Sequence, residues 1–258
     1  MSADLTKRCV LVTGGSSGIG RACAEAFAAR GCRLLLAARR KDRLDELASS
    51  LHERHGTEVL TASLDVRDRS AVEGWFAGLP GDWCEIDILV NNAGLSRGIE
   101  SLQRGDINDW EEMIDTNVKG LLYVTRTVLP GMIDRGCGHV INIGSIAGHE
   151  VYPGGNVYCA TKHAVTAINR SLAIDTLGTG IRVSSVDPGL VETEFSVVRF
   201  HGDQKRADGV YAGLEPLTPA DVAEAVLFCA TRPANANVRE MILTAGAQAS
   251  AVHVHRTS

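Results

Sequence analysis

TGGSSGIG, residues 13–20, joins a short apolar run, CVLVT at 9–13, to a stretch with helical periodicity, RACAEAFAAR at 21–30. Glycine allows the backbone to turn sharply and to approach a ligand closely, while the free N–H groups and positive end of a helix attract phosphate. A glycine-rich turn alone is a weak signal, because tight strand-to-helix turns also use glycine for structural reasons. Its place in the first strand–helix unit favours a dinucleotide pyrophosphate site.

Aliphatic runs alternate with longer amphipathic stretches along most of the chain. The strand candidates are 9–13, 33–37, 58–63, 86–91, 139–143, 181–186 and 240–243. The helix candidates are 20–30, 41–54, 69–78, 108–132, 157–177 and 219–230. The strand candidates are continuously apolar, which suits a parallel sheet covered on both faces. The pattern predicts an α/β Rossmann fold, a doubly wound, seven-stranded parallel sheet with helices on both faces.

The chain length of 258 residues fits one large α/β domain, so we expect a single domain over residues 1–258. Only 188–216 breaks the alternation, with no strong period and with charges scattered along it. An irregular stretch of this length in a compact domain is more often functional than a linker. It is predicted to be a lid over the substrate and the cofactor.

Charge and composition favour small-molecule partners. The formal net charge is −5, the sequence pI is near 5.9, and no basic tract is longer than residues 39–41. The chain therefore lacks the electrostatic footprint of a nucleic-acid-binding groove. The N-terminus lacks the pattern of a signal peptide, and no run of apolar residues reaches the length of a membrane span. These features predict a cytoplasmic protein without a membrane segment.

Metal binding is not expected. The seven cysteines form no CxxC pair, and their odd number argues against a disulfide framework. His253 and His255 lie two residues apart near the C-terminus, without a third candidate ligand close in sequence. A packed or solvated tail is favoured there, so no metal site is predicted.

The end of the second strand candidate carries arginines where an acidic residue would hydrogen-bond the ribose of NAD. Ala38 stands at that place, and Arg39 and Arg40 follow. Guanidinium groups match a phosphate in charge and in geometry, so this pair predicts NADP, with its 2′-phosphate, as the cofactor. The alternative is that both arginines only form the solvated start of a helix.

YCATK, residues 158–162, places a tyrosine and a lysine four residues apart. On a helix the two side chains lie on one face, one turn apart. The pKa of a free phenol is about 10, and a neighbouring cation favours the phenolate. Lys162 is expected to be that cation for Tyr158, the alternative being a solvated helix face.

An ordered set of motifs resembles the short-chain dehydrogenase/reductase family across nearly the whole chain. These motifs are TGGSSGIG, NNAG at 91–94, Asn117 in TNVKG, Ser145 in GSIAG, YCATK and PG at 188–189. LPGDWCEIDILVNNAGL, IDTNVKGL, RTVLPGM, GGNVY, PGLVETEFSVVRF and VHR resemble the subgroup of NADP-dependent 3-hydroxy acid dehydrogenases, which includes serine and allo-threonine dehydrogenases and malonic semialdehyde reductases. The resemblance implies a homotetramer and the strand order 3-2-1-4-5-6-7.

The resemblance implies catalytic roles for four residues. Tyr158 is the general acid that protonates the carbonyl oxygen in reduction and the base in oxidation. Lys162 also hydrogen-bonds the nicotinamide ribose, and Ser145 holds the substrate oxygen and stabilises the charge that develops there. Asn117 holds a water that links Lys162 to solvent. The hydride comes from the cofactor.

The resemblance also implies cofactor contacts along one cleft. Asp65 and Val66 flank the adenine, Thr193 lies near the nicotinamide amide, and Asn92 lines the cleft or ties the fourth strand to its neighbours. The complete set of expected cofactor-binding residues is Gly14, Ser16, Ser17, Gly18, Ile19, Gly20, Arg39, Arg40, Asp65, Val66, Asn92, Tyr158, Lys162, Pro188, Gly189 and Thr193.

Substrate binding is expected to involve Ser145, Tyr158 and Arg199. The guanidinium of Arg199, in the predicted lid, is suited to hold a carboxylate or sulfonate, the alternative being a solvated side chain on the lid surface. His149 and Glu150 stand where relatives vary and are candidates to face the substrate. Glu150 in such a place repels a carboxylate or grips an amine.

The residues and the resemblance together predict an NADP-dependent oxidoreductase acting on a small 3-hydroxy acid or its oxo form, such as serine, allo-threonine or 3-hydroxypropionate. One alternative is a broad carbonyl or sulfoacetaldehyde reductase, or a biosynthetic ketoreductase acting on larger ketones. Another is a non-catalytic NADP-binding sensor, although such a protein could lose Tyr158 and keep the glycine turn. The physiological substrate, the direction of reaction and its stereochemistry stay open at this stage.

Overall fold

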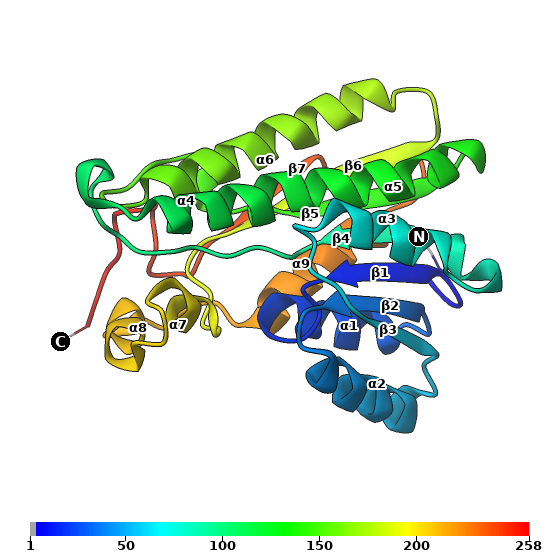
Figure 1. Ribbon diagram of the computed structural model, residues 1–258, viewed down its shortest axis with the longest axis horizontal. Helices are drawn as coiled ribbons and strands as arrows, with labels where there is room; N and C mark the ends of the chain where they lie inside the picture. The colour runs from blue at the N-terminus through cyan, green and yellow to red at the C-terminus, as the bar shows by residue number, and fades with distance from the viewer. Residues whose placement is uncertain (1–3, 258) are drawn as a thin grey trace.

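The computed structural model describes residues 4–257, and its centre is one parallel sheet of seven strands (Figure 1). The strands are β1 (Cys9–Thr13), β2 (Arg33–Ala38), β3 (Val59–Ser63), β4 (Ile88–Asn91), β5 (Gly138–Ile143), β6 (Ile181–Pro188) and β7 (Glu240–Leu243). Their order is β3-β2-β1-β4-β5-β6-β7, and every neighbouring pair is parallel. The predicted seven-stranded, doubly wound Rossmann sheet is thereby confirmed.

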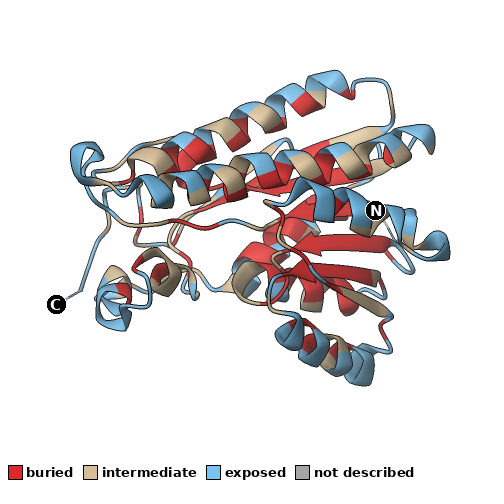
Figure 2. Ribbon diagram, in the orientation of Figure 1, coloured by how far each residue is buried: buried red, intermediate tan, exposed pale blue. Residues whose placement is uncertain are grey.

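Helices cover both faces of the sheet, as predicted (Figure 1). One face carries α1 (Gly18–Ala28), α2 (Lys41–His55) and α9 (Pro219–Ala230). The other carries α3 (Arg69–Ala77), α4 (Ile107–Ile114), α5 (Leu121–Asp134) and α6 (Asn156–Asp175). Figure 2 shows the strands buried between these two layers, while the outer faces of the helices are exposed. In the central strands, successive side chains pack against one helical layer or the other, which explains why these strands are continuously apolar. The edge strands β3 and β7 are only partly buried.

The prediction of one unbroken helix over 108–132 is wrong. A π-helical segment, Asp115–Gly120, separates α4 from α5, and Asp106 rather than Asn108 caps the start of α4. A side chain in place of Gly120 would press against Val66, so the wide turn and the glycine let this helix lie close to the end of β3. Such wide turns are common at functional sites, and the segment contains Asn117.

The stretch 188–216 has more regular structure than the sequence indicates. It contains α7 (Phe195–Arg199) and α8 (Gln204–Tyr211), which lie beside the C-terminal segment at the carboxyl edge of the sheet (Figure 1). The carbonyl of Arg199 accepts a hydrogen bond of 2.9 Å from the backbone N–H of Gly98, so α7 is docked on the loop after β4. The segment therefore lies against the edge where the carboxyl ends of the strands meet.

Short 3₁₀ turns complete the secondary structure at Gly81–Cys84, Leu102–Arg104 and Ile146–Gly148. Pro219 is the first residue of α9, as expected, and Thr218 and Asp221 form a reciprocal capping box there. No helix among residues 4–257 is both long enough and apolar enough to cross a bilayer.

Candidate active site

A cavity of about 800 Å³ opens at the carboxyl ends of the strands, beside the point between β1 and β4 where the strand order reverses. Ligands of open α/β sheets bind at such a point. The expected site residues that line the cavity are Gly14, Ser16, Ser17, Gly18, Ile19, Arg39, Arg40, Asp65, Val66, Asn92, Ser145, Tyr158, Lys162, Pro188, Gly189, Thr193 and Arg199. Gly20 and Asn117 lie behind its wall.

The glycine-rich turn presents free backbone N–H groups to this cavity. Ser17 caps α1 with an extended backbone but without a side-chain hydrogen bond to the first turn, which leaves those donors for a ligand. Gly14 has φ of +66°, a value that favours glycine, and the amide nitrogen of Asn92 donates to the carbonyls of Thr13 (2.9 Å) and Gly14 (3.2 Å). Asn92 therefore lines the cavity and also ties the end of β4 to the glycine-rich turn.

Arg40 lies at one end of the cavity and is tied to the glycine-rich turn. Its Nη2 donates to the hydroxyl of Ser17 (2.7 Å), and its Nε lies 3.4 Å from the hydroxyl of Ser16. Its Nη1 pairs with Glu194, 2.7 Å away. Arg39 is half exposed and lies 3.8 Å from Glu112. Two guanidinium groups and two hydroxyls at one end of a long cavity fit a phosphate group in charge and donor chemistry.

The carboxyl group of Asp65 closes the cavity beside β3. Arg67 donates to it through the side chain and the backbone N–H, and these hydrogen bonds lower the pKa of Asp65. Val66 is buried against Gly120 of the π-helical segment. An ionised acid and an apolar side chain thus form adjoining walls at the expected adenine position.

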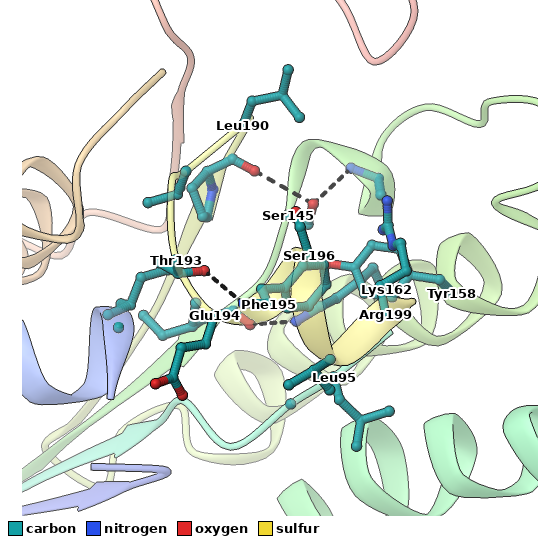
Figure 3. A pocket seen from close by; sticks show the side chains of 18 of the residues that line it. Leu95, Ser145, Tyr158, Lys162, Leu190, Thr193, Glu194, Phe195, Ser196 and Arg199 are labelled. Atoms are coloured by element: carbon teal, nitrogen blue, oxygen red, sulfur yellow. Dashed lines mark hydrogen bonds between the residues drawn. The ribbon is translucent and has the colours of Figure 1, made fainter. Parts of the chain in front are cut away.

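Ser145, Tyr158 and Lys162 come together although the serine precedes the tyrosine by 13 positions in the sequence (Figure 3). Ser145 follows the end of β5, and its hydroxyl accepts the N–H of Ala147 at 3.1 Å. Tyr158 and Lys162 lie on one face of α6, with Lys162 Nζ 5.9 Å from the centre of the tyrosine ring. The ammonium group donates to the carbonyl of Ile143 at 2.9 Å, which fixes it against the end of β5.

The pKa of Tyr158 reflects its burial and the charges around it, and the expected effect of Lys162 on the phenol stays a prediction. Burial raises the pKa of Tyr158, and the cation whose charge opposes this rise is Arg199. Lys162 has its own displacement, because burial lowers its pKa to about 8 while the charge of Asp187 raises it. Burial therefore shifts both the phenol and the ammonium group towards their uncharged forms, and the charge of Asp187 opposes this shift at Lys162.

Asn117 lies in the π-helical segment and is fully engaged in hydrogen bonds. Its Nδ2 donates to the carbonyl of Leu95 (2.8 Å) and the hydroxyl of Thr161 (3.0 Å), and its Oδ1 accepts the N–H of Leu95 (2.8 Å). A Cβ atom on Gly94 would lie 3.3 Å from that Oδ1 and 3.8 Å from Lys162 Nζ. Gly94 thus leaves a small space between the amide and the ammonium group.

Arg199 points into the cavity and lies among aromatic side chains, as Figure 3 shows. Its Cζ lies 5.4 Å from the ring centre of Tyr158 and 5.2 Å from that of Phe195. Nε donates to Ser96 (3.1 Å) and Nη2 to the hydroxyl of Tyr152 (2.9 Å). No carboxylate within residues 4–257 forms an ion pair with Arg199, so its charge is directed to the cavity.

His149 and Glu150, the two candidates to face the substrate, are not among the residues that line the cavity. Nε2 of His149 lies 2.8 Å from Oδ2 of Asp187, and Glu150 accepts the backbone N–H of Ala251 at 2.8 Å. The carboxylate of Glu150 therefore neither repels an acid nor grips an amine here. It holds the C-terminal segment instead.

Several cavity residues are absent from the sequence-based set. Tyr152, Phe195 and Glu194 line the cavity, and so does the C-terminal segment through residues such as Val252 and Arg256. Arg256 donates to backbone carbonyls at the end of α8 and just after it. In the sequence, Tyr152 begins the YPGGN stretch at 152–156, Glu194 and Phe195 lie in PGLVETEFSVVRF, and Arg256 ends VHR. None of these motifs indicates what its side chains contact.

Comparison with known proteins identifies the class. The family model of the short chain dehydrogenases matches residues 8–203. The chain belongs to this family of oxidoreductases, which confirms the prediction from its motifs.

The more specific likenesses cover nearly the whole chain. The sequence is 48% identical over 249 residues to an NADP-dependent 3-hydroxy acid dehydrogenase of Escherichia coli strain K12, covering 96% of this chain and 99% of that protein. It is 47% identical over 233 residues to sulfoacetaldehyde reductase 2 of Chromohalobacter salexigens, covering 90% and 92%. The closed form of a serine dehydrogenase complexed with NADP⁺ superposes with a TM-score of 0.90 at 47% identity, covering 96% and 100%.

Proposed function

We propose that this protein is an NADP-dependent oxidoreductase that interconverts small 3-hydroxy acids and their oxo forms. The observation that carries the proposal is one continuous cavity, which holds Arg40 and the serines of the glycine-rich turn at one end and Ser145, Tyr158 and Arg199 at the other. The names of the relatives and of the matched structure agree with both parts of the proposal, NADP as the cofactor and a 3-hydroxy acid as the substrate.

The NADP site is proposed to begin at the glycine-rich turn. Gly14, Ser16, Ser17, Gly18, Ile19 and Gly20 form the turn and the first turn of α1, whose N–H groups suit a pyrophosphate. Arg40, with Arg39 beside it, would hold the 2′-phosphate, and Asp65 and Val66 would flank the adenine. Asn92 would hold the turn in shape, while Pro188, Gly189 and Thr193 would cover the nicotinamide end.

In the proposed reaction, Tyr158 gives a proton to the carbonyl oxygen during reduction and takes the hydroxyl proton during oxidation. Ser145 would donate a hydrogen bond to the same oxygen and stabilise its developing charge. Lys162 would hold the cofactor ribose and favour the phenolate, and Asn117 with Gly94 would leave space for a water that reaches Lys162. NADP, when bound, supplies or accepts the hydride.

Arg199 is proposed to select acidic substrates. Its guanidinium faces the cavity beside Tyr158, so it could hold a carboxylate while the 3-hydroxyl meets the phenol. A sulfonate presents the same charge, and the likeness to a sulfoacetaldehyde reductase keeps such a substrate as the second candidate.

The remaining assignments also belong to the proposal. Residues 1–258 would form a single NADP-binding domain, with 188–216 as the lid that closes over the cofactor and the substrate. The family resemblance supports a homotetramer, and a cytoplasmic location is proposed from the sequence features. Arg199 is the last residue of α7, and its carbonyl accepts a hydrogen bond from the N–H of Gly98. A movement of the lid would therefore also move the side chain that is proposed to bind the acid group of the substrate.

The test is a panel of initial rates with NADP⁺ and, in parallel, NAD⁺. The panel contains L-serine, D-serine, 3-hydroxypropionate, 3-hydroxyisobutyrate, isethionate and a neutral secondary alcohol. Turnover with acidic 3-hydroxy compounds and NADP⁺ is expected. Turnover of the neutral alcohol alone would overturn the acid-binding role of Arg199 and indicate a general carbonyl reductase.

A further inference from the structure

Asp187 is a fully buried carboxyl group near the end of β6 that the proposed reaction does not use. Its Oδ2 lies 2.8 Å from Nε2 of His149, and its Oδ1 accepts a hydrogen bond from Ser185. Burial raises the pKa of Asp187, and the hydrogen bonds with Ser185 and His149 oppose that rise, so these two partners favour the ionised carboxylate. The side chain of His149 remains 18% exposed, so the pair reaches from the interior to solvent.

The carboxyl group of Asp187 lies directly behind the catalytic end of β5. A Cβ atom on Gly144 would overlap its Oδ1, which places the carboxyl group against the backbone between Ile143 and Ser145. The ammonium group of Lys162 donates to the carbonyl of Ile143 from α6. The buried carboxyl group of Asp187 therefore lies against Gly144, and the buried ammonium group of Lys162 binds the neighbouring residue, Ile143.

We propose that the His149–Asp187 pair is a positioning device of the active site, which holds a carboxylate behind Gly144 so that Lys162 stays cationic next to Tyr158. His149 acts only through Asp187 and does not touch the reacting groups. The part that concerns Tyr158 rests on the proposed function. The effect on Lys162 is a property of the folded protein and can be tested without a substrate.

Other charges near the pair do not provide the same counter-charge. The pKa of Arg170 of α6 is raised mainly by its ion pair with Glu240 of β7, 2.6 Å away on an exposed surface, and less by the charge of Asp187. The hydrogen bond from Arg170 and, to a smaller extent, the charge of His149 lower the pKa of Glu240. On the other side, Tyr158 shares α6 with Lys162, and the nearest cation over its ring face is Arg199 of α7. Among the described residues, Asp187 is the acid whose charge raises the pKa of Lys162.

The direct test is a pH titration of the lysine side chains by NMR, with ¹³C at the ε carbon. The chain has five lysines, Lys7, Lys41, Lys119, Lys162 and Lys205, and Lys162→Met identifies the signal of interest. In the parent protein this signal is expected to titrate near pH 8. In Asp187→Asn its midpoint should fall by about one pH unit, the usual effect of losing an opposite charge. In His149→Gln, which keeps the carboxyl group but removes the imidazole that favours its ionised form, the midpoint should fall in the same direction by a smaller amount.

Two precautions keep the result decisive. Glu240→Gln, which removes an acid on the exposed side of His149, is the matched control and should leave the titration of Lys162 unchanged. His149 is partly exposed, so His149→Gln remains available if Asp187→Asn does not fold. An unchanged Lys162 midpoint in both folded variants would overturn the proposal, and so would an equal shift in the control.

A kinetic measurement then tests the catalytic consequence. The alkaline limb of kcat for alcohol oxidation should move to lower pH in both variants by the amount seen for Lys162, with the KM for NADP⁺ unchanged. A role limited to structural support would lower kcat at every pH without moving the limb. If no acid substrate is oxidised, the proposed function fails, but the NMR result for Lys162 stands independently.

Discussion

The guanidinium of Arg199 lies over the aromatic ring of Tyr158, with 5.4 Å between Cζ and the ring centre. The two residues are on different elements, α7 and α6, and both line the same cavity. The charge of Arg199 lowers a phenol pKa that burial raises. In the proposed function, one side chain therefore serves both the binding of an acid substrate and the ionisation of the general acid.

Replacement of Arg199 by Met is expected to lower kcat/KM for acidic substrates by about 10- to 100-fold, the usual value of a hydrogen bond to a charged group. A neutral alcohol should lose much less. Initial rates on both substrates measure the difference. Arg206→Gln is the matched control, because that arginine lies on α8 against Phe200 and outside the cavity lining. Equal losses on acidic and neutral substrates would contradict the anchor role.

Tyr158→Phe is expected to lower kcat by about 10²- to 10⁴-fold, since it removes the proposed general acid and base. NADPH binding, measured by fluorescence titration, should change little, because the aromatic ring and its contact with Phe195 remain. Turnover close to that of the parent would rule out the proposed mechanism.

Arg40→Ala is expected to weaken NADPH binding by about tenfold or more while NADH binding changes little, because the proposed 2′-phosphate contact is charge-assisted. Arg39→Ala should have a smaller effect, since Arg39 has its closest ion-pair contact at 3.8 Å and is 55% exposed. Dissociation constants for both nucleotides decide the matter. If both variants weaken NADPH and NADH equally, neither arginine serves as a phosphate anchor.

His139 predicts an acid-sensitive stability. Burial lowers its pKa from 6.5 to about 3, so the unfolded chain binds a proton at this residue below pH 6.5 and the folded chain does not. The free energy of unfolding should therefore fall as the pH drops from 6.5 towards 3, by about 1.4 kcal/mol per pH unit from this group. Urea unfolding at several pH values measures the slope.

The variant His139→Gln tests this assignment. It should reduce the pH dependence of the free energy of unfolding, whatever it does to the stability at any one pH. The exposed His255, replaced by Gln, serves as the control and should leave the slope as it is. A slope that is unchanged in His139→Gln would show that other groups set the acid sensitivity.

The sheet was predictable from sequence because its strands are continuously apolar and each is followed by a turn or a helix. All seven strand candidates overlap an observed strand, and 9–13 and 240–243 coincide with β1 and β7. The interruption between α4 and α5 was not predictable. It depends on the packing of Gly120 against Val66, a contact between segments distant in the chain.

The site was predictable to the extent that its residues lie in motifs. The glycine-rich turn, Ser145 and the Tyr158–Lys162 pair each carry a local pattern, and the structure brings them to one cavity. The surroundings of Arg199 carry no such pattern. Tyr152 and Ser96, which orient its guanidinium, lie 47 and 103 residues away in sequence. The His149–Asp187 pair is likewise formed only when β6 and the turn after β5 pack together.

The groups assigned to the chemistry and the group assigned to substrate choice come from different parts of the fold. Ser145 and Tyr158 stand on the sheet edge and on α6, whereas Arg199 stands on a short helix inserted between β6 and α9. Sequence change can therefore accumulate in that insertion while the hydride-transfer machinery is inherited intact. Divergence of specificity within such a lineage is expected to concentrate in α7 and α8, and exchanging this insertion between paralogues is a direct route to new activities.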